Sequence, residues 1–84
     1  YPNPFNPTTQ IKFSINSSDY VELVIYDILG QQVATLLSKH LHEGNHEINW
    51  DGTDMNGNMV TSGIYIYQLR TSYEIKSRRM TLLR

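Results

Sequence analysis

The feature that most limits the fold is a turn-rich stretch, residues 49–67, between two segments with strand-like patterns. It contains the only Trp of the chain and three of its five Gly. Before it, His46, Ile48 and Trp50 alternate with polar residues, which is the period-two pattern of a half-buried strand. After the turn formers, residues 64–69 are β-branched or aromatic. The pattern therefore predicts two strands joined by a long loop.

Alternation of apolar and polar residues predicts further strands over residues 8–15, 20–26 and 74–84. Residues 31–38 fit either a bulged strand or one helical turn, and the tight turn before them favours the strand. Residues 39–45 are polar and are predicted to form a loop. In the last strand the expected core residues are Ile75, Met80 and Leu82.

These segments predict an all-β fold, an antiparallel Ig-like β-sandwich of six or seven short strands with no significant helix. The connections are too short for parallel crossovers. A chain of 84 residues is one domain. We assign residues 8–84 to the sandwich and residues 1–7, which hold all three prolines, to a linker or strap. The expected structural core is Val21, Leu23, Ile25, Trp50, Gly63 and Tyr65.

Composition excludes several kinds of chemistry. The chain has no cysteine, so disulfides, thiolate metal sites and a Cys nucleophile are excluded. No serine lies in a Gly-x-Ser-x-Gly elbow, and no pair of carboxylates lies in an apolar setting. We therefore expect neither enzymatic activity nor a cofactor. Because the sequence opens at Tyr1 without Met, we expect it to be a piece of a longer protein.

Two groups of residues raise the question of a metal. Asp51, Asp54 and Asn56 supply the oxygen ligands that calcium prefers, but the spacing does not match an EF-hand. Asp and Asn also cap turns through their own side chains, which is the favoured interpretation, with calcium kept as the alternative. His40 and His42 with His46 suggest zinc, but solvated loop histidines are the favoured interpretation.

Charge is distributed unevenly along the chain. Residues 1–69 carry two basic and seven acidic side chains, a net charge of −5, whereas residues 70–84 carry five basic and one acidic, a net charge of +4. The whole chain is slightly acidic and the basic segment lacks interleaved aromatics, which disfavours nucleic acid as a partner. The remaining interpretations are a strand edge protected by charge and a segment recognised by another protein.

Four groups of residues occur in order along the chain. They are 1–7 (Tyr-Pro-Asn-Pro-Phe-Asn-Pro); 21–30 with Val33; Gly44 with Trp50-Asp51-Gly52; and Gly57, Val60 and Ser62-Gly63-Ile64-Tyr65 before a basic last strand. Together they resemble the type A carboxy-terminal sorting domain of proteins exported by the bacterial type IX secretion system. Residues 21–69 also resemble the Ig-like domain of flagellar hook-capping proteins, a relative that is not expected to account for the Pro-Asn-Pro opening or the chain end.

The resemblance implies a non-catalytic domain that directs export of a larger secreted protein across the outer membrane and onto the cell surface. It implies the type IX machinery and a sortase-like peptidase as partners, with neither nucleic acid nor membrane insertion involved. By position it places the sorting signal in the last strand, at Lys76, Arg78, Arg79, Met80, Leu82, Leu83 and Arg84. The alternative is a structural Ig-like or carbohydrate-binding accessory module of a secreted enzyme, with Tyr20, Tyr26 and Tyr73 as the surface aromatics that hold the sugar.

Overall fold

The computed structural model describes residues 8–84, so the suggested strap at residues 1–7 lies outside the described part. Six strands make up the fold, and no helix occurs among the described residues, so none of them forms a helix able to cross a membrane. The strands are β1 (Thr9–Ile15), β2 (Asp19–Asp27), β3 (Gln32–Leu41), β4 (Gly44–Trp50), β5 (Gly63–Arg70) and β6 (Ile75–Leu82). The predicted all-β class is confirmed.

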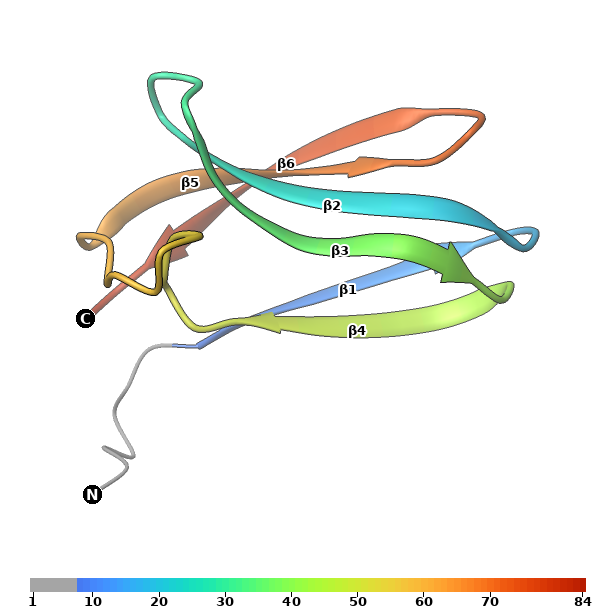
Figure 1. Ribbon diagram of the computed structural model, residues 1–84, viewed down its shortest axis with the longest axis horizontal. Coiled ribbons are helices and arrows are strands. Elements are labelled where there is room, and N and C mark those ends of the chain that lie inside the picture. The colour runs from blue at the N-terminus through green and yellow to red at the C-terminus, as the bar shows by residue number, and fades with distance from the viewer. Residues whose placement is uncertain (1–7) are drawn as a thin grey trace.

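The strands form two antiparallel sheets of unequal size. β1 pairs with β4 in a two-stranded sheet, and the larger sheet has the order β3-β2-β5-β6. The chain changes sheet after β1, after β3 and after β4. Figure 1 shows the pair β1 and β4 as a separate layer beneath β2 and β3. This arrangement is the Ig-like sandwich expected from the sequence.

The core lies between the two sheets. The smaller sheet contributes Ile11, Ile15 and Trp50, and the larger sheet contributes Val21, Leu23, Ile25, Ala34, Leu37, Tyr65, Leu69 and Leu82. Trp50 and Tyr65 come from different sheets, and their rings meet edge to face with centroids 5.1 Å apart. Five of the six residues expected in the core are thus buried, whereas Gly63 is half-buried at the first position of β5.

β2 is one of the two interior strands of the larger sheet and is covered on both faces over part of its length. Val21, Leu23 and Ile25 face the core and are fully buried. Val24 points to the opposite face and is nevertheless only 5% exposed, because its neighbours on β3 and β5 flank it across the ladder. Apolar residues therefore occur on both faces of this strand, which explains why its apolar and polar residues do not alternate strictly.

The prediction of a loop over residues 39–45 is wrong. β3 continues to Leu41, and β4 begins at Gly44, so only His42 and Glu43 lie outside the strands. Lys39 and His40 pair through their backbones with Val21 and Tyr20. A ladder is held by backbone hydrogen bonds, so polar side chains on an exposed edge strand do not end it. The register shifts twice along this pair, which confirms the bulged strand over the helical turn.

One acidic side chain is buried and connects two distant turns. Asp19, 9% exposed, begins β2, and Ser72 lies in the turn between β5 and β6. The Ser72 hydroxyl donates to Oδ1 of Asp19 at 2.5 Å, and the Ser72 backbone N–H donates to Oδ2 at 2.8 Å. The Ser72 hydroxyl, followed by its backbone N–H, lowers the pKa of Asp19 below the ordinary value of 3.8.

The lowered pKa of Asp19 predicts a pH dependence of stability. The ionised carboxylate stabilises the fold above about pH 4, and this contribution disappears as the pH falls through the lowered folded-state pKa. Asp19→Asn should therefore be less stable than the parent at pH 7. The difference should begin to shrink at about pH 4 and disappear once the pH is below the lowered pKa of the folded state. Urea midpoints measured from pH 7 to pH 2 check this. A difference that stays constant over the whole range would contradict it.

The hydroxyl of Tyr65 provides a second test of the core. It donates to the carbonyl of Thr61 at 2.7 Å from a ring that is only 6% exposed. Tyr65→Phe should cost about 0.5–1.5 kcal/mol of unfolding free energy, the typical net value of one such bond. Tyr73→Phe is the matched control, because that ring is 83% exposed and its change should stay within about 0.5 kcal/mol. Equal effects in denaturant titrations would show that the Tyr65 bond contributes nothing.

Candidate functional site

β6 is the most exposed strand of the larger sheet. It pairs with β5 along one edge, and within residues 8–84 its other edge has no partner strand. Six of its eight residues are exposed. The free edge offers unpaired backbone N–H and C=O groups to another strand.

The two faces of β6 differ in their surroundings. Met80 and Leu82 point into the sandwich, where Leu82 is 1% exposed and Met80 packs against the core. Since side chains alternate along a strand, Lys76 and Arg78 lie on this same inner face. They are nevertheless exposed. The inner face thus changes from apolar and covered to basic and uncovered within one strand.

The opposite face of β6 carries Ile75 and Arg79. Ile75 is 62% exposed, so its assignment to the core was wrong. It differs in parity from Met80 and Leu82, and residues an odd number apart on a strand cannot share a face. Among the residues predicted to form the sorting signal, Lys76, Arg78, Arg79, Leu83 and Arg84 are exposed, Met80 is half-buried and Leu82 is a core residue.

Three side chains hold the loop between β4 and β5 by its carbonyl groups. Trp50 Nε1 donates to the carbonyl of Thr53 at 2.9 Å, and the Tyr65 hydroxyl donates to that of Thr61. The guanidinium of Arg84 donates to the carbonyls of Val60 and Gly52. Figure 1 shows this loop and the chain end after β6 at the same end of the molecule. Arg84 therefore connects the chain end after β6 to this loop.

The backbone N–H of Arg84 also donates to the Ser62 hydroxyl at 2.9 Å, and its Nη1 lies 3.3 Å from Met59 Sδ. Sequence reasoning assigned Arg84 to a binding signal and did not foresee this structural role. No local pattern shows it, because the partners are 22 to 32 residues away along the chain.

Arg84 approaches the loop most closely at Gly52. It is buried, with φ at +79°, and a Cβ placed there would lie 2.6 Å from Arg84 Nη2 and 3.1 Å from Leu82 Cδ2. Only glycine satisfies both the backbone conformation and the space.

The acidic residues of the loop close turns. Asp54 Oδ1 accepts hydrogen bonds from the backbone N–H groups of Asn56 and Asn58 at 2.9 and 3.0 Å. Asp51 Oδ1 accepts from the backbone and hydroxyl of Thr53. These bonds match the turn-cap interpretation made from the sequence. Within residues 8–84, no three His, Asp or Glu side chains come together as metal ligands.

The turn between β2 and β3 has the same geometry as the turn at Asp54. Asp27 Oδ1 accepts from the N–H groups two and four residues later, as Asp54 does. In each turn a glycine three residues after the Asp has φ above +80° and donates to the carbonyl of that Asp. Asp-x-x-Gly is therefore a turn signal that occurs twice in this chain, and it explains Asp54 without a ligand.

The three histidines make separate contacts. His40 meets the ring of Tyr20 edge to face, His46 stacks on Phe13, and His46 Nε2 lies 2.7 Å from the carbonyl of His42. They do not converge on one point. The zinc interpretation has no geometric basis among these residues.

The tyrosines suggested for sugar binding are also dispersed. The Tyr20 hydroxyl bonds that of Ser38, and the Tyr26 hydroxyl accepts a hydrogen bond from Arg70. Tyr73 lies in the turn between β5 and β6. They do not form one flat platform.

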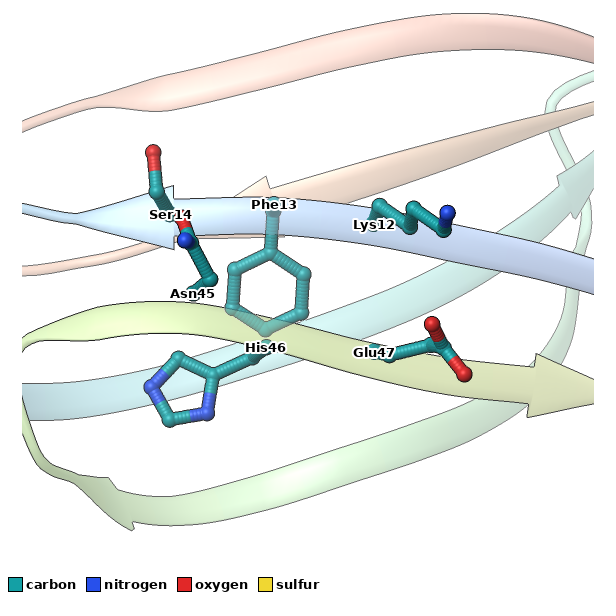
Figure 2. Close-up of a pocket in the computed structure, with 6 residues that line it drawn as sticks. All are labelled: Lys12, Phe13, Ser14, Asn45, His46 and Glu47. Carbon is teal, nitrogen blue, oxygen red and sulfur yellow. The ribbon is translucent and has the colours of Figure 1, made fainter.

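A hollow of about 540 Å³ lies over the ladder between β1 and β4. Figure 2 shows the ring of Phe13 directed toward His46, with Lys12 and Glu47 side by side at the neighbouring position of the ladder. All six lining residues come from three adjacent pairs of one ladder, so the hollow is the surface of a small sheet. It brings no nucleophile or pair of carboxylates together.

Comparison with known protein families assigns this chain to a family. The model of the FlgD Ig-like domain matches residues 3–74. The chain belongs to this family. The match begins inside the Pro-Asn-Pro opening, so the expectation that this relative would not account for the opening is wrong. It ends immediately before β6, so the last strand lies outside it. A comparison with curated proteins produced no match.

Two solved structures resemble this FlgD Ig-like domain. FlgD from P. aeruginosa is 25% identical with a TM-score of 0.71, over 89% of this chain and 59% of that one. Dimeric latent PorU from Porphyromonas gingivalis is 24% identical with a TM-score of 0.72, over 96% of this chain and 8% of that one. The domain thus spans only part of each of these proteins.

The contact between Gly52 and Arg84 predicts a specific energetic coupling. Gly52→Ala should cost about 1–3 kcal/mol of unfolding free energy through backbone strain plus the displaced guanidinium. Gly57→Ala is the matched control, because its φ is +82° but no atom lies within 4 Å of its added Cβ. Gly52→Ala should therefore be the more destabilising of the two.

Denaturant titrations of Gly52→Ala, Arg84→Ala and the double variant measure the coupling. The double variant should be more stable than the sum of the single effects predicts, by about 0.5–2 kcal/mol. Strict additivity, or equal effects at Gly52 and Gly57, would show that Arg84 does not contact the loop in solution.

Proposed function

We propose that this FlgD Ig-like domain is a non-catalytic sorting domain of a larger secreted protein. It directs export across the bacterial outer membrane by type IX secretion and surface attachment, and the export machinery recognises it through β6. The observation that carries the proposal is the state of β6, a basic strand with one free edge and six exposed residues of eight.

Edge pairing supplies a mechanism for recognition. A receptor strand can add to the free edge of β6 through backbone hydrogen bonds, which contribute affinity without requiring a particular sequence. Arg78 and Arg79 point to opposite faces of β6 and add charge selection on both. The bonds from Arg84 to the loop keep the strand extended before binding, which reduces the entropy lost on recognition.

The comparisons support the proposal at the level of fold. PorU is a type IX sortase, so the same sandwich occurs in a protein of that system. The four groups of residues quoted from the sequence resemble the type IX sorting domain, and the last of these includes the strand that the family match leaves out. On this proposal the partners are the secretion machinery and a sortase-like peptidase, and the location is the cell surface.

A structural role is the second candidate, and the family membership favours it. In a structural module like that of FlgD, β6 would only complete the larger sheet, and its basic side chains would keep the edge from pairing. The two candidates differ in whether the basic residues of β6 affect export of an attached protein.

The test is export of a reporter joined to the amino end of the 84-residue domain in a bacterium that has type IX secretion. Replacing Lys76, Arg78 and Arg79 by Gln removes three positive charges from exposed positions. If each contributes about 0.5 kcal/mol to recognition, surface-exposed reporter should fall about tenfold and periplasmic reporter should accumulate. Protease accessibility on intact cells and cell fractionation measure the two pools.

A variant with Gln10→Glu, Gln31→Glu and Asn45→Asp is the control. It changes net charge by the same three units at exposed positions outside β6. Its export should equal that of the parent domain. Normal export of the β6 variant, with both proteins folded by circular dichroism, would refute the sorting role and favour the structural one.

A further inference from the structure

A groove of about 200 Å³ separates β1 from β6 on the side of the sandwich where neither strand has a partner among the described residues. Lys12 and Phe13 line it from β1, Tyr67 and Leu69 from β5, and Lys76 and Arg78 from β6. It is distinct from the hollow over the β1–β4 ladder, although the two share the β1 residues Lys12, Phe13 and Ser14.

The groove exists because a two-stranded sheet packs against a four-stranded sheet. Leu82 is buried in the core, but Lys76 and Arg78 are on the same face of β6 and remain exposed. These two side chains are exposed because the smaller sheet has no further strand beside β1 that would cover them. Phe13 and Tyr67 are only half-buried there, so the floor of the groove is partly apolar.

The charges in the groove are all of one sign. Three cations line it and no carboxylate does. Glu74 lies 3.6 Å from the Lys76 ammonium, but both side chains are more than half exposed, and such pairs are weak and easily exchanged. Arg78 takes part in no salt bridge within residues 8–84. The groove thus favours an anionic occupant.

We propose that this groove binds an acidic, extended segment of another protein, which adds as a third strand to the free edge of β1. The segment's backbone pairs with β1, and the carboxylates on its inner face meet Lys76 and Arg78 above the rings of Phe13 and Tyr67. Lys12, on the outer face of β1, adds positive charge at the same edge. Arg78 accommodates a carboxylate with two parallel hydrogen bonds. A peptide fits better than an anionic sugar, because an unpaired strand edge satisfies a peptide backbone. The inference does not rest on the sorting role.

A simpler function for inward-facing charges at a sheet edge is to prevent aggregation by edge pairing. That function needs repulsion only and predicts no saturable ligand. The proposed site predicts saturable binding of a negatively charged ligand, with an affinity that depends on the basic residues of only one face of β6. The two are therefore separated by binding measurements on the purified 84-residue chain.

The probe is a fluorescent eight-residue peptide of alternating Glu and Val, compared with one in which Lys replaces Glu and one with a central Pro. Fluorescence anisotropy should show saturable binding of the Glu peptide only, weakening as salt rises. Arg78→Glu should weaken binding at least about tenfold, whereas Arg79→Glu, which makes the same charge change on the opposite face, should change it less than about twofold. Lys12→Glu should also weaken it, by an independent change on the other strand.

Amide chemical-shift changes on the parent protein locate the bound peptide without any substitution. They should concentrate on β1, with side-chain effects at Tyr67. The proposal is overturned if the Glu peptide does not saturate, if Arg78→Glu and Arg79→Glu weaken binding equally, or if the shifts fall on the free edges of β3 or β4. Absence of binding together with self-association of Arg78→Glu would assign the cations to edge protection alone.

Discussion

The loop between β4 and β5 is held by hydrogen bonds to four of its carbonyl groups, those of residues 52 and 53 and of residues 60 and 61. The rest of the structure depends on these bonds. Trp50 and Tyr65 pack edge to face across the two sheets, and each also donates a hydrogen bond to the loop, at Thr53 and Thr61. Arg84 binds the neighbouring carbonyls of Gly52 and Val60. Each of these bonds contributes a typical net value of about 0.5–1.5 kcal/mol, so together they stabilise the loop and the adjoining core. They connect the junction of the sheets to the end of the last strand.

The unequal size of the sheets determines which part of that strand is available. At Leu82 the inner face of β6 is part of the core, and at Lys76 and Arg78 the same face is open. A free edge and exposed cations therefore occur together on the part of β6 that lines the groove beside β1. The proposed recognition of β6 and the proposed binding in the groove beside β1 both depend on this exposed part of the strand. The family match, which ends at residue 74, describes the sandwich without this strand.

Local features were predictable from the sequence because their partners are close along the chain. Period-two alternation predicted the strands, and Val21, Leu23 and Ile25 fall where it placed them. Asp54 caps its own turn, as the preference of Asp for such positions indicates. The loop predicted over residues 39–45 was wrong, since polar composition does not prevent backbone pairing at an edge.

The sequence by itself determined most of the strands, the antiparallel class and the basic character of the last segment, because each depends on residues within a few positions. Only the tertiary structure decided that Arg84 supports the loop and that Asp19 binds Ser72, 53 residues away. It also decided which face of β6 is covered. These outcomes depend on which strands pair and how far one sheet extends over the other, and such contacts join segments that no local pattern relates.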